Sequence, residues 1–451
     1  MFKNIRSLPE TDILVIGAGS AGCVASMAAA SDRRYKVTLV ERYGFPGGTS
    51  TQMLDTFYGF FTPGEAPKKI VAGLPDLVVN TLDAYGEVFL RPNTYGAGTG
   101  VNYHPERLKW VWDKLLIQSG VQLLLHTVLI DVNRLSDGRY ECIFWNKGGF
   151  FSCTPKRIID TSGDADFCHL AGFAYELAGE QEPAQSMTTT FRMANVNLDA
   201  YEQAGGKKML ADLMSATAHP LPRKEGSAHE MNIPSCISTV AVKVAGKSGL
   251  NGLDLTHAEI EGREQAFIFE SFFRSEVPGY ADAKIIGLSN QIGVRETRRV
   301  YGKHRLTREA CMRAMVPNDV VFLCGAPIED HRSGQDNEAE TVWAYIPEGG
   351  VYGVGYGTLV PEKSDTVWVA GRCFSATHDA HASCRSMAQT MSMGQAVGFA
   401  AVQSLQLDES ASDLSVAALQ QTLLEQGALL ETPDRVAVTV RNGWRANVKS
   451  K

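Results

Sequence analysis

The sequence lacks the features that mark several common classes of protein. None of its nine cysteines forms a C-x-x-C or C-x4-C pair, so neither a zinc site nor a redox dithiol is expected, and no bound metal is predicted. No run of about 18 apolar residues occurs, and a membrane span is therefore not expected. The net charge of −7 comes without any basic run, which argues against nucleic acid as a partner.

The opening residues, MFKNIRSLPETD, have no apolar core of signal-peptide length. Cysteines that are scattered and odd in number fit a reducing compartment, and we expect a cytoplasmic protein. Hydrophobic residues make up 44% of the chain and charged residues 21%, which is the balance of a soluble globular protein. The length of 451 residues suits two or three domains, or one large enzyme with an inserted domain.

A dinucleotide-binding motif lies in the first predicted βαβ unit. DILVI at 12–16 and KVTLVE at 36–41 are typical of buried parallel strands, and a helix of small residues over 20–31 joins them. The turn between has the pattern G-x-G-x-x-G, whose glycines let a pyrophosphate reach the helix N-terminus. Glu41 is placed to accept hydrogen bonds from an adenosine ribose. The alternative is a glycine-rich turn beside a surface glutamate. The candidate residues are Gly17, Gly19, Ser20, Ala21, Gly22 and Glu41.

The residues after Glu41 indicate FAD rather than NAD. ERYGFPGGTST at 41–51 continues with a second glycine pair and several hydroxyl side chains. This looks like the flavoprotein pattern in which the chain passes close to the pyrophosphate and the flavin. An ordinary Pro-Gly loop is the alternative. The candidates here are Arg42, Gly47, Gly48, Thr49 and Thr51.

Further elements are expected along the chain. PERLKWVWDKLLIQS at 105–119 has helical spacing with a proline in the first turn. RIIDTSGDAD at 157–166 and DTVWVAG at 365–371 are typical of buried strands, and DLSVAALQQTLLEQG at 413–427 of an amphipathic helix. From about 175 to 345 the pattern becomes more polar and irregular, which favours an inserted domain.

Four segments resemble the FAD-dependent oxidoreductases of the glutathione-reductase-like superfamily, and within it the bacterial family related to fumarate reductase and succinate dehydrogenase flavoproteins. They are the N-terminal motif with ERYGFPGGTST, IIDTSGDADFCHLAG, QIGVRETRRVYG and VWVAGRCFSATHDAHASCRSMAQTMSMGQAVGFAA. The resemblance implies an α/β fold, in which a discontinuous FAD-binding Rossmann-like domain of the glutathione-reductase type carries an inserted α+β substrate domain. We expect the FAD-binding domain over 1–175 and 346–410, the insertion over 176–345 and a C-terminal helical tail over 411–451.

The resemblance also implies which further residues meet FAD. The first and last segments of the domain would meet around one flavin, and the backbone of Val128 would meet the adenine. Thr161 and Ser162 replace the more usual Ala-Thr of the family's Ala-Thr-Gly-Asp element. A helix beginning near Gly394 would aim its N-terminus at the flavin, where a positive helix end stabilises the reduced form; a tightly packed core helix is the alternative. The residues implied are Val128, Ser162, Gly163, Asp164, Gly371, Arg372, Arg385, Gly394, Gln395 and Ala396.

Some relatives attach the flavin covalently through a histidine that follows the ribose glutamate. This chain has no histidine between 41 and 60, and we expect noncovalent FAD.

Candidate catalytic residues are few. His378 and His381 lie in the segment expected to face the flavin, and either could act as acid or base; bonding to a backbone carbonyl or capping a helix is the alternative for both. His331 lies at the edge of the expected insertion. Arg295 could hold a substrate carboxylate or carbonyl oxygen, although an Arg–Glu network through Glu296 that ties the domains together is the favoured explanation of GVRETRR.

We therefore predict an enzyme that transfers a hydride between FAD and a small polar organic substrate, either by dehydrogenation at CH-OH, CH-NH or CH-CH or by C=C reduction. An external electron donor or acceptor would close the cycle. One alternative is a flavin monooxygenase, although hydroxylases usually have Gly-Asp where this chain has Gly371-Arg372. Another is an electron-transfer subunit of a larger complex. The tail helix is compatible with a homo-oligomer contact.

Overall fold

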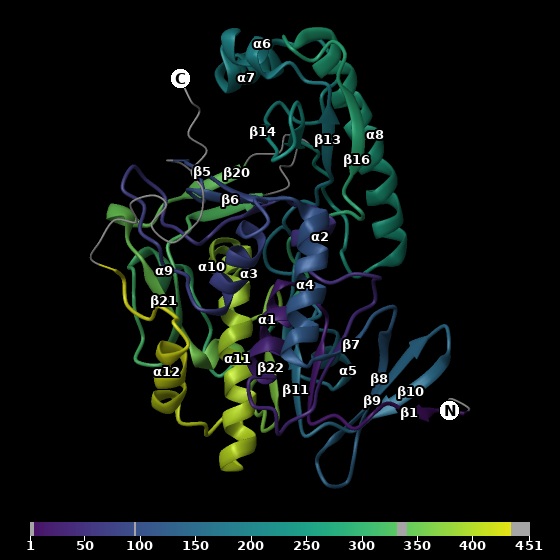
Figure 1. Ribbon diagram of the computed structural model, residues 1–451, viewed down its shortest axis with the longest axis vertical. Helices are drawn as coiled ribbons and strands as arrows, with labels where there is room; N and C mark the ends of the chain where they lie inside the picture. The colour runs from purple at the N-terminus through teal and green to yellow at the C-terminus, as the bar shows by residue number, and fades with distance from the viewer. Residues whose placement is uncertain (1–3, 94–95, 332–340, 434–451) are drawn as a thin grey trace.

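The computed structural model describes residues 4–93, 96–331 and 341–433. The chain forms a large body around a parallel sheet and a smaller unit that projects from one end of it (Figure 1). The last part of the expected C-terminal tail, 434–451, lies outside the described residues. No helix among the described residues is long and apolar enough to cross a membrane.

A five-stranded parallel sheet organises the large body. Its strand order is β22-β11-β2-β3-β7, and every residue of β2 and β3 is buried. Strands covered on both faces need continuous apolar sequence, which is why ILVI and VTLV form them. The predicted βαβ unit is confirmed, with helix α1 as the crossover. The bounds are β2 Ile13–Ile16, α1 Ser20–Ala29, β3 Val37–Val40, β7 Gln122–Leu124, β11 Arg157–Asp160 and β22 Val367–Val369.

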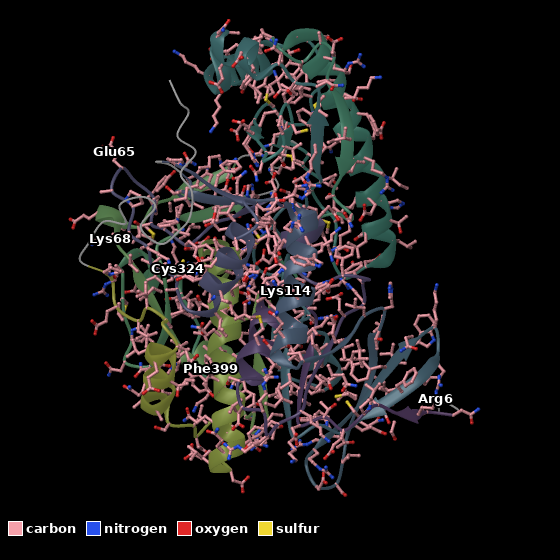
Figure 2. The ribbon with its side chains drawn as sticks, in the orientation of Figure 1. Arg6, Glu65, Lys68, Lys114, Cys324 and Phe399 are labelled. Carbon is pink, nitrogen blue, oxygen red and sulfur yellow. The ribbon has the colours of Figure 1, made fainter. Side chains whose placement is uncertain are left out.

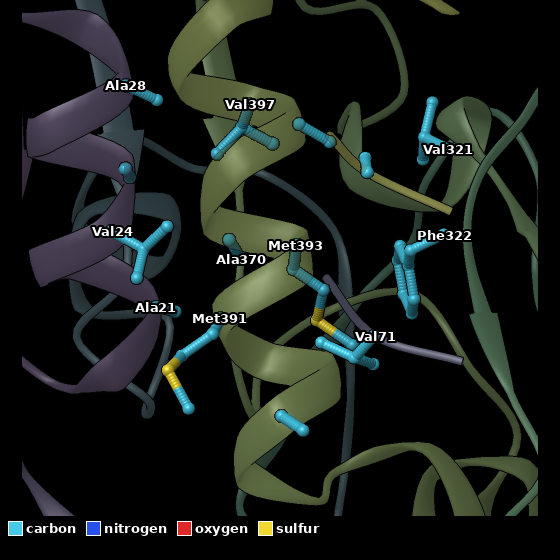
Figure 3. Close-up of a cluster of buried hydrophobic side chains, with 14 of the residues drawn as sticks. Ala21, Val24, Ala28, Val71, Val321, Phe322, Ala370, Met391, Met393 and Val397 are labelled. Atoms are coloured by element: carbon cyan, nitrogen blue, oxygen red, sulfur yellow. The ribbon is translucent and has the colours of Figure 1, made fainter. Parts of the chain in front are cut away.

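Helix α11, Met387–Leu407, packs directly against α1, although the two are far apart in the sequence (Figure 3). Ala21 and Val24 of α1 face Met391 and Val397 of α11 in this contact. A Cβ atom added to Gly394 would collide with the carbonyl oxygen of Ala21. The density of small residues in the late segment therefore serves helix–helix packing.

The expectation that this late helix begins near Gly394 is wrong, because it begins at Met387. The start lies about two helical turns earlier. Gly394, Gln395 and Ala396 are consequently in the buried helix interior, rather than at an end that could point at a cofactor.

A second sheet has the order β1-β10-β9-β8, antiparallel except for the parallel pair β1-β10. It shares a buried cluster with the parallel sheet, in which Phe144 lies with Leu14 and Ile16. Other short strands and helices complete the large body. Their bounds are β1 Arg6–Ser7, α2 Thr49–Gln52, β4 Thr56–Phe57, α3 Leu74–Asp83, β5 Val88–Arg91, β6 Gly100–Tyr103, α4 Pro105–Ser119, β8 Val128–Arg134, β9 Tyr140–Asn146, β10 Gly149–Cys153, α5 Asp166–Leu170, β12 Tyr175–Leu177, β17 Arg298–Val300, α9 Arg308–Met312, β18 Val320–Cys324, β19 Ile328–His331, β20 Thr341–Ala344, β21 Tyr352–Gly355, α10 His378–Cys384 and α12 Val416–Glu425, with 3-10 turns at Pro347–Gly349 and Tyr356–Leu359.

The smaller unit has its own hydrophobic core. Its antiparallel sheet, β14-β15-β13-β16, packs with the long helix α8 at the top of Figure 1, and its buried cluster runs from Met187 to Ile292. The segment from Leu306 to Ala326 packs instead in the core of the large body. The domain boundaries given above stay a prediction. The bounds are β13 Thr190–Ala194, α6 Leu198–Gln203, α7 Gly206–Ala216, β14 Ser227–Glu230, β15 Ile237–Val240, α8 Gly252–Glu276 and β16 Lys284–Leu288.

Side chains follow this division between interior and surface. Cys324 and Phe399 lie inside the large body, whereas Arg6 and Glu65 project at its edges (Figure 2). All nine cysteines lie in the described residues and all are free thiols. Helix α12 buries Leu419 and Leu423 in the main core, so core packing accounts for its apolar face, and the homo-oligomer stays a prediction.

Candidate functional site

A cavity of about 670 Å³ lies where the parallel sheet meets the smaller unit. Gly17, Glu41, Ser162 and Gly371 line it, each just beyond the carboxyl end of a different strand of the sheet. His229 of β14 lines the same cavity from the smaller unit. Ligands of open parallel sheets bind at this edge, so the sheet order brings four distant segments to one site.

Glu41 anchors the end of the cavity that the dinucleotide motif predicts. Its Oε2 accepts a hydrogen bond from the backbone N–H of Ala18 at 2.7 Å, and its Oε1 accepts one from Tyr43 at 3.0 Å. Burial raises the pKa of this carboxyl above its ordinary value, although the two N–H donors oppose that shift. Each oxygen keeps a second lone pair, which can accept a hydrogen bond from a ribose hydroxyl.

The N-terminus of α1 offers an anion site beside Glu41. Within the described chain no side chain caps this helix, whose N-cap residue is Gly19, so the first-turn N–H groups are free for a ligand. A Cβ atom added to Gly19 would meet nothing within 4 Å. Gly48, with φ of +54°, packs on it so closely that an added Cβ would lie 2.9 Å from the Cα of Gly19. Two glycine loops thus form one cradle, and its donors fit the pyrophosphate of a dinucleotide.

Most of the predicted cofactor residues line this cavity, and the rest support its walls. Thr51 Oγ1 donates to the carbonyl of Pro46 at 2.7 Å, and Gln395 Oε1 accepts from the first backbone N–H of α3, that of Leu74, at 2.6 Å. The lining residues are Gly17, Gly19, Ser20, Ala21, Glu41, Arg42, Gly48, Thr49, Val128, Ser162, Gly163, Gly371, Arg372 and Arg385. Those outside the lining are Gly22, Gly47, Thr51, Asp164, Gly394, Gln395 and Ala396.

The beginning of α11 does reach the cavity. Ser386, Met387 and Thr390 line it, and within the described residues the N-cap Ser386 makes no side-chain capping bond. A positive helix end therefore faces the site as the resemblance implied, but from residues other than Gly394 to Ala396.

Arg372 and Asp164 form a supporting ion pair at 2.6 Å. Arg372 Nε also donates to the carbonyl oxygen of Gly163 at 3.0 Å, and Asp164 accepts from Thr297 at 2.9 Å. The pair connects the loops after β11 and β22. Arg372 lines the cavity, and Asp164 does not line it but holds Arg372 in place.

His378 and His381 are not brought to the cavity. Both ring nitrogens of His378 have carboxylate partners, Glu296 at 3.0 Å and Asp330 at 3.1 Å. Arg299 is paired with Glu296 and, at 2.9 Å, with Glu176. The expectation that His378 faces the cofactor is therefore not met, and the Arg–Glu network is the arrangement that the structure contains.

His381 is bonded to a backbone carbonyl. Its Nε2 donates to the carbonyl oxygen of Arg372 at 2.8 Å. Burial, followed by the charges of Arg299 and Arg385, lowers the pKa of His381 well below its ordinary value. This neutral ring holds the loop after β22 against α10, which is the alternative considered for it above.

His331 lines the cavity with both ring nitrogens engaged. Its Nε2 lies 3.1 Å from Glu329 and its Nδ1 3.2 Å from the hydroxyl of Thr341. Burial, followed by the charge of Arg295, lowers the pKa of His331 to about 3. At neutral pH it is an uncharged ring that positions Glu329.

Two half-buried arginines line the same cavity. Arg295 donates to the carbonyl oxygen of Ser186, and Arg385 donates to Gln185 Oε1 at 2.9 Å. Burial, followed by the charge of Arg385, lowers the pKa of Arg295 to about 9, so its guanidinium is still protonated at neutral pH. Burial opposes ionisation of Glu329, but His331 and these arginines lower its pKa to about 2.

An Asp–His pair also lines the cavity, and the sequence did not point to it. His229 Nε2 lies 2.9 Å from Asp55 Oδ1, and both side chains are buried. The two residues are 174 positions apart, and neither belongs to a motif. The only available signal is that Asp55 follows the second glycine loop within a few residues.

The chain is similar to a known protein family and to several solved structures. A family model described as FAD dependent oxidoreductase matches residues 12–423. No curated protein sequence matches the chain. Similar solved structures include CabE, an aromatic hydroxylase from angucycline biosynthesis, at 12% identity and a TM-score of 0.48, covering 94% of this chain and 70% of that one.

Two other solved structures cover nearly the whole of both chains. One is p-nitrophenol 4-monooxygenase PnpA from Pseudomonas putida DLL-E4, with 9% identity, 97% and 93% coverage and a TM-score of 0.46. The other is a geranylgeranyl bacteriochlorophyll reductase-like protein from Thermoplasma acidophilum, with 10% identity, 98% and 95% coverage and a TM-score of 0.46. Likeness at this level carries no argument about the reaction.

Proposed function

The chain belongs to the FAD-dependent oxidoreductase family, and from this premise we propose that it transfers a hydride between noncovalently bound FAD and a small polar substrate. The observation that carries the proposal is the continuity of one cavity from the dinucleotide cradle at Gly19 and Glu41 to the polar groups Arg295, Arg385 and His229. The cofactor and the substrate can therefore meet inside a single chamber.

The residues present fit FAD at the first end of that chamber. The free N–H groups of α1 would hold the pyrophosphate, Glu41 would accept hydrogen bonds from the ribose, and Val128, which lines the cavity, would meet the adenine. The start of α11 presents a second positive helix end. Bound FAD supplies two-electron chemistry, while the protein supplies binding, orientation and proton handling.

Arg295 and Arg385 supply recognition of the substrate at the other end. Both are half-buried at the cavity wall near Glu329, and Arg385 is also near Asp330. Two guanidinium groups partly removed from water favour an anionic partner, and a guanidinium pair matches a carboxylate. We therefore propose a substrate that carries a carboxylate or another anionic group.

The first test is to reduce the flavin with candidate substrates in the absence of oxygen. The purified holoprotein would be mixed with 2-hydroxy acids, amino acids and saturated acids while the visible flavin band is followed. Bleaching by one of these compounds, and its reversal by an external electron acceptor, is the expected result. No bleaching by any of them, together with rapid bleaching by NAD(P)H and oxygen uptake, would overturn the proposal in favour of a monooxygenase.

A further inference from the structure

We propose that His229, oriented by Asp55, carries the proton in this reaction, by taking it from a hydroxyl or amine group on the carbon that loses the hydride. The inference rests on the proposed function and narrows it. Of the reactions considered above, it concerns oxidation at CH-OH or CH-NH.

The hydrogen bond between the two side chains defines which ring nitrogen is free. An ionised carboxylate only accepts, so Nε2 of His229 must carry the hydrogen that it donates to Asp55 Oδ1 at 2.9 Å. In the neutral ring, Nδ1 is then the unprotonated nitrogen. Within the described part of the chain Nδ1 makes no hydrogen bond, and the ring lines the cavity. A lone pair is thus available to a molecule bound there.

The second histidine of the cavity lining offers no such atom. Both nitrogens of His331 have partners, Glu329 and Thr341. Asp55, by contrast, has a buried Oδ2 with no hydrogen-bond partner among the described residues. This carboxylate is held through Oδ1, by His229 and by the hydroxyl of Thr56 at 3.2 Å, so its position fixes the ring and leaves Nδ1 for the substrate.

Charges around the pair keep its two members in the protonation states that this role needs. Burial opposes ionisation of Asp55, but His229, Arg192 of β13 and Arg91 of β5 hold the pKa of Asp55 below its ordinary value. Burial lowers the pKa of His229 more than Asp55 raises it, and Arg91 and Lys207 of α7 lower it further. At neutral pH, a carboxylate therefore orients an imidazole that is free to take a proton.

The step balances with FAD as the electron acceptor. In the oxidative direction the carbon loses its hydrogen with both electrons of that bond to FAD. The hydroxyl or amine loses its proton to Nδ1 of His229, and the carbon–oxygen or carbon–nitrogen bond becomes double. The protonated imidazole then releases the proton to solvent, and in the reverse direction it acts as the acid.

The pair also joins the two parts of the molecule. Asp55 lies between α2 and β4 of the large body, beside the second glycine loop, whereas His229 is on β14 of the smaller unit. The proton carrier is in place only when the smaller unit covers the cavity. An ordinary structural ion pair between the two parts is the competing explanation, and the two make different predictions.

The test uses His229→Gln and Asp55→Asn in the holoprotein, with His219→Gln as the matched control. His219 is a partly buried histidine of the smaller unit, 3.3 Å from Glu276, and it does not line the cavity. Flavin bleaching by 2-hydroxy acids and amino acids is measured without oxygen over a range of pH. FAD content and circular dichroism show that each variant is folded and loaded.

The expected result is a loss of about 100-fold or more in the bleaching rate of His229→Gln, the usual contribution of a general base. The rate in the unchanged protein should rise with pH through a pKa below the ordinary histidine value, because the base must be unprotonated. Asp55→Asn should move that pKa lower, since the carboxylate no longer raises it. His219→Gln should behave as the unchanged protein.

The possible negative results overturn different proposals. If no compound bleaches the unchanged protein, the proposed function fails and this inference with it. If the unchanged protein is bleached and His229→Gln is bleached at the same rate, the proposed function stands and this inference is overturned. Nitrogen NMR of histidine-labelled holoprotein gives an independent check, because a hydrogen on Nδ1 rather than Nε2 of neutral His229 would also overturn it.

Discussion

At the scale of single residues, Arg295 and Arg385 are the feature that sets the kind of substrate. Both guanidinium groups are half-buried at the cavity wall. Arg295 donates one hydrogen bond to the carbonyl oxygen of Ser186, and Arg385 donates one to Gln185 Oε1. A guanidinium carries five N–H groups, so donors remain for a ligand in the cavity.

Replacement of Arg295 by Gln should weaken the binding of an anion much more than the binding of FAD. Loss of one partner from a buried charge pair costs about 2 kcal/mol or more, which is roughly 30-fold in Kd. Oxalate, an unreactive carboxylate, would be titrated while the flavin spectrum is followed. Arg263→Gln on the exposed face of α8, where Arg263 pairs with Glu259, is the matched control. Equal loss of FAD and oxalate binding by Arg295→Gln would contradict the assignment.

Residues that belong to a local motif could be predicted from the sequence, and those assembled by tertiary contacts could not. Gly19 and Glu41 were found because strand, turn and helix lie within one short segment. His229 and Asp55 meet only through the folding of the smaller unit onto the large body. His378 was predicted from its place near the end of the chain, but its environment of Glu296 and Asp330 depends on distant segments.

At the scale of secondary-structure elements, the contact between α1 and α11 controls the cofactor site. Both helices present one end to the cavity, through Gly19 and Ser386. Gly394 and Gly398 allow them to approach so closely that added side-chain atoms would collide with backbone of α1 at Ala21 and Ala25. Because Gly394 and Gly398 have no side chains, α11 can lie this close to α1, and the positive ends of the two helices are held at a fixed distance from each other.

Gly394→Ala should disturb both the fold and the binding of FAD. Overpacking a filled contact costs about 1 to 3 kcal/mol, and here α1 must shift because the obstacle is a backbone oxygen. Lower stability in urea and weaker FAD binding are the expected results. Gly252→Ala in the first turn of α8 is the control, since its Cβ would meet nothing, and it should be neutral or slightly stabilising. Unchanged FAD affinity in Gly394→Ala would show that the crossing does not control the site.

Strongly periodic or fully apolar elements were predictable, whereas the start of α11 was not. The helix over 105–119 has apolar spacing, a first-turn proline and Gly120 after its last residue, and its predicted bounds are confirmed. Between α10 and α11 the sequence SCRSMAQ contains neither proline nor glycine, and within the described residues Ser386 makes no capping bond. The start of α11 therefore has no strong local signal, and Gly394 inside the helix was the more conspicuous residue.

At the scale of the whole molecule, one cavity is lined by parts of the chain that are far apart in the sequence. Segments after four strands of the parallel sheet, the start of α11 and strand β14 all contribute to its wall, and the smaller unit lies at one end of the large body (Figure 1). The large body and the smaller unit have separate hydrophobic cores. A bound dinucleotide therefore fills a space between independently packed parts.

Removal of FAD should consequently lower the stability of the large body. A ligand that binds only the folded state stabilises it by about 2.7 kcal/mol at 100 times its Kd, and a chain of this size should gain a few degrees in Tm. The apoprotein and the holoprotein would be melted while circular dichroism and flavin fluorescence are followed together. Flavin release should coincide with loss of helix signal, because the α1 end holds the cofactor only while α1 and α11 are packed. Flavin that stays with the denatured chain would show covalent attachment and contradict the noncovalent site.

Glu41→Gln should reduce the rise in Tm that a fixed concentration of FAD produces, since the buried acceptor for the ribose is weakened.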